Sequence, residues 1–229
     1  EALAHQLSAA DLFVSAVNPK LVKDFNNDSL RKIKSDKADS VKIARYALDK
    51  WQSLEPYSIT DELRAQLKVM NRQFHFYVKQ KTAMKNNLIG LIDQTYPNAN
   101  TYFNSPTRSD GSQKWVDFVS TYWHVDCIRK MSLNAFVEHY QNWCKRKKYA
   151  FNKSKAEEIY TKTKELVPVF PKNEITKHII RQAVDQLNST SVTVETIRTL
   201  MNETASKLPE YSIVMQFKGI GPSLGPQLM

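Results

Sequence analysis

Apolar residues recur at helical spacing along most of the chain. Over residues 63–91 they alternate in steps of four and three, the heptad pattern of a long helix with one apolar seam. Lys81 interrupts this seam with a charged side chain. The pattern fits a coiled coil and equally a long core helix of a globular domain. The apolar positions are Leu63, Leu67, Met70, Phe74, Tyr77, Met84, Leu88 and Leu91.

A second heptad pattern follows residue 173. Threonines stand between some of its apolar positions and weaken the pattern, and the polar run Asn188–Ser191 could divide it into two helices. An αα-hairpin is therefore the alternative to a second coiled coil. The positions seven residues apart are Ile180, Leu187, Val194, Met201 and Leu208.

The N-terminal part of the chain has a different pattern of apolar residues. Residues 12–17 form a short apolar run closed by Asn18-Pro19, the best strand candidate in the chain. A helical pattern over residues 1–9 precedes it, and another follows from Asp36 until Pro56. Alternation of helix, strand and helix favours a mostly parallel sheet. The expected fold class is thus mostly α, with a partial α/β part.

Residues 94–113 are rich in Pro, Asn and Ser, which indicates a long loop and a domain boundary. Helical patterns resume after it, with many aromatic residues and one dense basic run. We expect a partial catalytic domain with a long basic helix, a helical aromatic and basic insertion, a helical or coiled-coil segment, and the start of a C-terminal domain. In order, these are residues 1–95, 96–172, 173–211 and 212–229.

Charge narrows the function classes. Among 229 residues, 33 Lys and Arg outnumber 23 Asp and Glu, for a net charge of +10. This balance points to a polyanionic partner such as nucleic acid, or else to an anionic membrane surface. No apolar run approaches the length of a membrane span. The two cysteines form no disulfide framework, which favours a reducing cytosol.

The cations gather in a few places that could contact phosphates. They lie in the polar loop of residues 26–35, on one flank of the helix over 63–91, and in a basic run beside Trp143, Tyr149 and Phe151, whose rings could stack on bases. Solvated helix faces and helix ends are the alternative explanation. The candidates are Arg31, Lys32, Lys34, Arg64, Lys68, Arg72, Lys79, Lys85, Lys145, Arg146, Lys147 and Lys148.

Two carboxylates, Asp36 and Asp39, open the helical pattern that follows the basic loop. Residues three apart project from the same face of a helix. Carboxylates there repel one another unless a cation lies between them, and a divalent metal is the usual one. The alternative is a solvated helix start, where Ser35 or Asp36 caps and acids suit the helix dipole.

Near the C-terminus, Gly219-Ile220-Gly221-Pro222 follows an apolar stretch and Lys218. Glycines before a new helix are typical of a helix-hairpin-helix element, in which backbone amides of residues such as Gly219 and Gly221 approach a phosphate. A simple tight turn between helices is the alternative.

Four residues are of types that bind zinc, namely His124, Cys127, His139 and Cys144. The paired short spacings typical of zinc sites are missing. We therefore interpret these residues as packed side chains of amphipathic helices.

The order of these features resembles the DEDD-type transposases, and more narrowly the insertion-sequence-one-ten family of bridge-RNA-guided recombinases. The resemblance covers nearly the whole chain, and its most specific part is the joint occurrence of the motifs. It is carried by Asn18-Pro19, the basic loop, Lys34–Ser40 with its Asp pair, Lys85–Leu88 on the long basic helix, and Lys218–Pro222.

The resemblance implies a RuvC-like (RNase H-like) domain, a coiled-coil region and a C-terminal transposase domain. Family members bind divalent metal through four acidic residues, the last two of which form an Asp-x-x-Asp pair that Asp36 and Asp39 match. It also implies Mg²⁺ (or Mn²⁺) as cofactor, metal-assisted DNA cleavage and rejoining, and a serine nucleophile in the C-terminal domain.

Other catalytic positions of the family find no match here. Glu1 lacks the context of the family's second acid, and Ser223 does not match the nucleophile. The chain starts without Met and stops at Met229 within an expected helix. We therefore expect a fragment of a larger enzyme, inactive by itself.

The partners implied are DNA, a structured guide RNA and further copies of the chain, joined by the coiled coil into a dimer or tetramer. No membrane association is expected, and the implied location is the bacterial cytoplasm, on the nucleoid when bound. Two alternatives stay open: a non-catalytic basic helical nucleic-acid-binding protein, and a structural coiled-coil protein.

Overall fold

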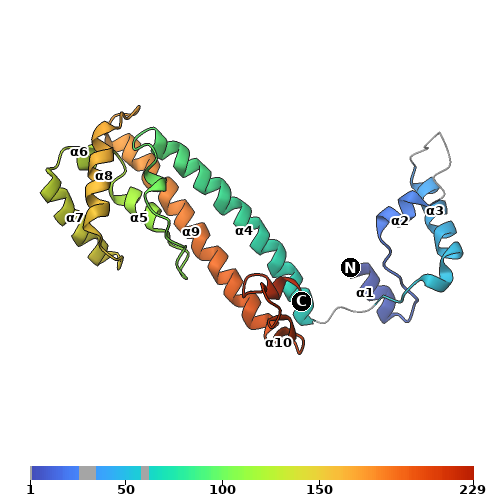
Figure 1. Ribbon diagram of the computed structural model, residues 1–229. Helices are drawn as coiled ribbons and strands as arrows, with labels where there is room; N and C mark the ends of the chain where they lie inside the picture. The colour runs from blue at the N-terminus through green and yellow to red at the C-terminus, as the bar shows by residue number, and fades with distance from the viewer. Residues whose placement is uncertain (1, 26–34, 58–61) are drawn as a thin grey trace. The chain divides into compact units, whose positions relative to one another are not determined.

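The computed structural model describes residues 2–25, 35–57 and 62–229, and the chain divides into two compact units, Glu1–Asp61 and Glu62–Met229 (Figure 1). All regular elements of the described residues are helices, so the mostly α class is confirmed. The sequence placed the long helix 63–91 with the N-terminal residues in a domain ending at 95. In the structure this helix belongs to the second unit, because it packs along a helix near the C-terminus.

The N-terminal unit contains helices α1 (Ala2–Ala9), α2 (Pro19–Asp24), α3 (Asp36–Asp49) and the short 3₁₀ helix η1 (Trp51–Ser53). Local chemistry sets the start of α2. The Asn18 side chain accepts a hydrogen bond from the Lys20 amide, and Pro19 occupies the first turn of α2, where no amide donor is needed. The helices predicted over residues 1–9 and from Asp36 are confirmed by α1 and α3.

The strand predicted over residues 12–17 is wrong. This segment is irregular, and the Val14 carbonyl accepts one hydrogen bond, from the Tyr57 amide at 2.6 Å. A strand exists only through a ladder to a neighbour, and no described segment pairs along this one. The predicted parallel sheet is accordingly absent from the part of the chain that the structure describes.

No side chain is fully buried in the described part of the N-terminal unit. Its apolar contacts are local, such as Phe13 against Trp51 and Phe25 against Tyr46, with ring centroids 5.0 and 5.3 Å apart. Leu48 on α3 remains 80% exposed. The described residues of this unit thus do not close a core of their own.

The second unit is built on a pair of long helices, α4 (Glu62–Asp93) and α9 (Glu174–Ala205), which lie side by side in Figure 1. Leu67 shares a buried cluster with Met201, whereas Leu88 shares another with Ile180, so the helices run antiparallel. The two predicted heptad seams therefore face each other within one chain. The polar run Asn188–Ser191, which left a division into two helices open, does not interrupt α9.

A helical module joins the two long helices at the end where α4 stops and α9 begins (Figure 1). It consists of η2 (Ala99–Thr101), α5 (Lys114–Thr121), α6 (Asp126–Arg129), α7 (Leu133–Arg146) and α8 (Lys153–Glu165). Aromatic rings dominate its core, because α5 and α7 place their rings on inward faces. Fully buried among them are Tyr96, Phe118, Tyr122, Phe136, Tyr140 and Trp143.

The C-terminal residues form the short helix α10 (Tyr211–Val214), turns, and the 3₁₀ helix η3 (Gly225–Gln227). No α-helix follows Gly221 within residues 222–229, so the predicted helix-hairpin-helix element and the helix expected at Met229 are both wrong. No helix among the described residues has the length and apolar character needed to cross a membrane.

Candidate metal and nucleic-acid sites

Asp36 and Asp39 lie in the first turn of α3, as predicted. The Ser35 hydroxyl accepts a hydrogen bond from the Ala38 amide at 3.2 Å and so caps the helix. Both aspartates are exposed, and acids in this turn suit the helix dipole. Asp39 also lines a cavity of about 740 Å³, together with the apolar side chains of Phe13 and Trp51.

The two carboxylates fit the oxygen ligands that Mg²⁺ prefers, and they stand one helical turn apart. No cluster of three or more His, Cys, Asp or Glu residues suited to a metal occurs among residues 2–25, 35–57 and 62–229. The described residues therefore offer two carboxylates at this place and no third ligand-type side chain clustered with them. Two lysines, Lys23 and Lys42, also line this cavity, and the Lys42 ammonium donates to the carbonyl oxygen of Lys23 at 2.6 Å.

Residues 1–97 match the family model of the IS110 DEDD transposases, described as "Transposase". The match supports a transposase. It includes Asp36, Asp39 and the whole of α4, whereas the helical module and α9 lie outside it. No curated protein and no solved structure matches the chain.

The cations predicted to contact DNA or RNA are spread over both units. Arg31, Lys32 and Lys34 lie outside the described residues. On α4, Arg64 forms an ion pair with Glu210, the residue before α10. Four other predicted cations of this helix are exposed, namely Lys68, Arg72, Lys79 and Lys85.

The basic run Lys145–Lys148 lies at the C-terminal end of α7, where the helix dipole favours cations. Lys147 forms an ion pair with Asp117 at 2.8 Å, whereas Lys145, Arg146 and Lys148 are exposed at the surface.

The rings expected to interleave with these cations are mostly not available for stacking on bases. Trp143 is 1% exposed, and Tyr149 donates its hydroxyl to Asp117 at 2.7 Å and stacks on Trp143. Phe151, at 36% exposed, is the most accessible of the three. The sequence could not separate these cases, because spacing along α7 does not reveal which rings meet α5.

Lys218 and Gly219 are exposed in the C-terminal turns, and Gly221 is half-buried. A Cβ at either glycine would meet no atom within 4 Å. Gly219 has φ +94°, a backbone conformation that favours glycine. These glycines therefore serve a turn within the described structure, and their amides precede no α-helix.

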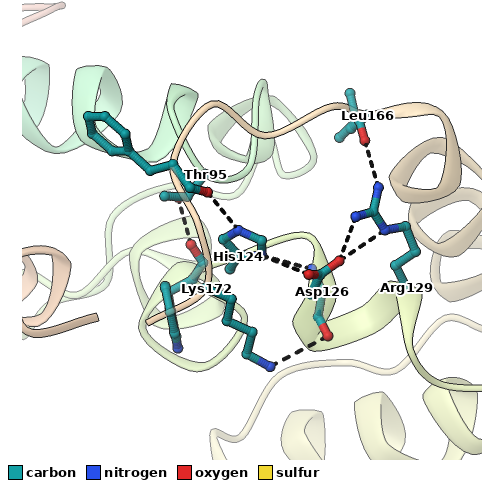
Figure 2. A network of polar contacts seen from close by, with 8 residues as sticks. Thr95, His124, Asp126, Arg129, Leu166 and Lys172 are labelled. Carbon is teal, nitrogen blue, oxygen red and sulfur yellow. Dashed lines mark hydrogen bonds and ion pairs between the residues drawn. The ribbon is translucent and has the colours of Figure 1, made fainter. Parts of the chain in front are cut away.

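A polar network in the helical module includes residues that the sequence left without a role (Figure 2). His124 is buried; its Nδ1 accepts from the Asp126 amide, and its Nε2 therefore carries the proton donated to the Phe170 carbonyl, each at 3.0 Å. Arg129 binds Asp126 and the Leu166 carbonyl. Since both ring nitrogens are engaged, His124 holds the chain together and offers no lone pair to a metal.

The sequence also missed a group of cations that the structure brings together at the aromatic core. They come from the loop after η2, from α5 and from α8, so no short motif links them. These residues are Arg108, Lys114 and Lys155.

Proposed function

We propose that this chain acts as a DEDD-type transposase in DNA transposition or site-specific recombination, with Asp36 and Asp39 in its metal-binding set. The match over residues 1–97, which contains both aspartates, is the observation that carries the proposal. Their exposed placement in one helical turn beside a cavity supports it, because a scissile phosphate and an ion need access from solvent.

The chemistry follows from the charges. Bound Mg²⁺ or Mn²⁺ would neutralise negative charge at the phosphate whose bond is cleaved. Asp36 and Asp39 would hold the ion through their carboxylate oxygens, and Ser35 fixes the helix turn that orients them. By family resemblance the nucleophile is a serine, and no serine of this chain is assigned that role.

DNA and a structured guide RNA are the proposed partners, held through their backbones by exposed lysines and arginines, while base pairing selects sequence. Assembly into a dimer or tetramer is also proposed. The heptad seams of α4 and α9 are covered by each other within one chain. Contacts between copies would therefore use other surfaces than these seams.

A transposition assay in cells carrying the element and the gene for this protein tests the proposal. The double variant Asp36→Asn plus Asp39→Asn keeps side-chain shape and removes the charges. We expect element excision to fall by a factor on the order of 100 or more, since metal ligands are lost. Asp49→Asn, which removes an exposed acid from the other end of α3, is the matched control. Unchanged excision by the folded double variant would refute the assignment.

A non-catalytic basic nucleic-acid-binding protein is the second candidate. It is favoured by the exposed Arg72, Lys79 and Lys85 on α4. This candidate predicts that Asp36→Asn plus Asp39→Asn leaves every cellular function intact, whereas neutralising the cations of α4 abolishes binding.

A further inference from the structure

Three cations gather around aromatic rings on one side of the helical module. The Arg108 guanidinium lies 3.9 Å from the ring centroid of Tyr149. The Lys114 ammonium lies 5.0 Å from the Phe103 centroid and 5.2 Å from that of Tyr149. Lys155 reaches a neighbouring ring, with its ammonium 5.9 Å from the Tyr102 centroid. Segments distant in sequence thus bring positive charge to one place.

Little negative charge offsets these cations. Arg108 donates to the carbonyl oxygens of Lys147 and Lys148 at 2.9 and 2.8 Å, and Lys114 reaches the Ala150 carbonyl at 3.5 Å. Neither forms a salt bridge with a carboxylate among the residues that the structure describes. Two carboxylates lie near this region. Asp117 is already bound by Lys147 and the Tyr149 hydroxyl. Asp110 interacts electrostatically with Arg108, and its carboxylate accepts a hydrogen bond from the Ser112 amide.

Lys155 does have an acidic partner, Glu158 at 2.9 Å. Glu158 is shared with Lys162, whose ammonium lies 2.7 Å away. One carboxylate therefore serves two lysines, and the region keeps an excess of positive charge.

The position of Lys114 is unfavourable in the absence of an anion. It is half-buried, and burial lowers the pKa of its ammonium group, with Arg108 and Lys155 lowering it further. It is also the first residue of α5, where the helix dipole opposes a cation, unlike Lys145 and Arg146 at the end of α7. Contact with the rings of Phe103 and Tyr149 compensates in part.

We propose that Arg108, Lys114 and Lys155 form a binding site for a phosphodiester group of a nucleic-acid strand. The site rests on the proposed function and adds to it a contact in the helical module, outside the residues that match the transposase family. A phosphate would offset the repulsion among the three cations, and each releases counterions on binding. The chemistry is the same for DNA and RNA, so the experiment uses both.

Binding of a short fluorescent DNA duplex and of an RNA hairpin to the 229-residue chain is measured over a series of salt concentrations. Lys114→Met keeps the aliphatic stem and removes the charge. We expect affinity to fall about three- to tenfold and the salt slope to decrease by about one. Lys177→Met removes a charge that Glu174 already pairs, and serves as control. Lys114→Arg is expected to keep most of the affinity.

The outcomes separate the site from the function. Equal affinity and salt slope for Lys114→Met and the control would overturn the site and leave the function standing. Failure of the unchanged chain to bind either nucleic acid would overturn both. If Lys114→Met weakens binding of only one of the two nucleic acids, DNA or RNA, that nucleic acid supplies the phosphate.

A second measurement needs no variant and covers the case in which Lys114→Met does not fold. Lysine acetylation of the unchanged chain is mapped with and without nucleic acid. We expect protection of Lys114 and Lys155 and none at Lys177. Equal protection by inorganic phosphate alone, at matched ionic strength, would show a free-anion site and overturn the assignment to a nucleic-acid strand.

Discussion

Gly111 packs against the backbone of Ser191 so closely that a Cβ at residue 111 would lie 2.8 Å from the Ser191 carbonyl carbon and oxygen. Gly111 also has φ +82°, and its amide donates to the Arg108 carbonyl at 2.9 Å. The loop that carries Arg108 is thus held against the middle of α9. Ser191 lies in the polar run Asn188–Ser191, through which α9 continues, and it is 1% exposed.

We predict that Gly111→Ala lowers the free energy of unfolding by about 2 kcal/mol or more, because the new methyl group meets backbone and the positive φ disfavours alanine. Chemical denaturation measures this change. Gly90→Ala is the control, because Gly90 lies within α4 and a Cβ there would meet no atom within 4 Å. It is expected to stabilise by up to about 1 kcal/mol. Similar effects of the two substitutions would contradict the close contact.

His124 connects the turn before α6 to the segment that leads into α9. His124→Ala is expected to lower stability by about 2–4 kcal/mol, because it opens a cavity and leaves the Phe170 carbonyl and the Asp126 amide without their partner. Thermal or chemical unfolding measures the loss, and hydrogen exchange should quicken at the Asp126 amide. His178→Ala, at an exposed position on α9, is expected to change stability by less than about 0.5 kcal/mol. An equal loss in both variants would argue against this role.

The helices of this protein could be predicted from the sequence, because helix formation depends on residues that are close together in the chain. The period of the seams predicts α4 and α9, and Ser35 before Asp36 predicts the start of α3. The heptad pattern of one helix does not specify, however, which helix packs against it. Pairing of Leu67 with Met201 inside one chain, rather than between copies, depends on the path of the chain through the helical module.

The errors concern features that depend on distant segments. Residues 12–17 are apolar enough for a strand. A strand, however, requires backbone hydrogen bonds to a neighbouring strand, and the sequence of one segment does not show whether such a neighbour is present. Trp143 and Tyr149 stand beside lysines in sequence, yet their rings point into the core because α5 lies against them. Conversely, Arg108 and Lys114 meet at one ring although no motif joins them.

Lys81 occupies an apolar seam position of α4, facing Glu195 and Arg198 of α9. Burial lowers the pKa of its ammonium group; Glu195 opposes this shift, and Arg198 adds to it. Lys81→Leu is therefore expected to stabilise the chain by about 1 kcal/mol at neutral pH through added apolar burial. Denaturation of both proteins measures the difference, with Lys79→Leu at an exposed position as control.

The same site predicts a pH dependence of stability. Because the pKa of Lys81 is lower in the folded than in the unfolded state, the unfavourable contribution is complete at neutral pH, where both states are protonated. As the pH rises through the folded pKa, the unfolded state binds more protons and the unchanged chain gains stability. The advantage of Lys81→Leu should therefore narrow with rising alkaline pH. An advantage that widens would contradict the lowered pKa.

Arg64 and Arg72 share a flank of α4, but their surroundings differ. Arg64 is bound to Glu210, whereas Arg72 is exposed. A cation already neutralised by an acid releases fewer counterions when it meets a phosphate, so the two arginines should contribute unequally to nucleic-acid binding. Arg72→Ala is expected to reduce the salt slope by about one, and Arg64→Ala to change it less. Arg64→Ala should instead lower stability by up to about 1 kcal/mol, the usual range for a surface ion pair.

Titrations of fluorescent DNA at several salt concentrations, with denaturation of each variant, measure both effects. If Arg64→Ala weakens binding as much as Arg72→Ala does, the Glu210 pair does not limit the reach of this side chain, and the basic flank acts as one surface.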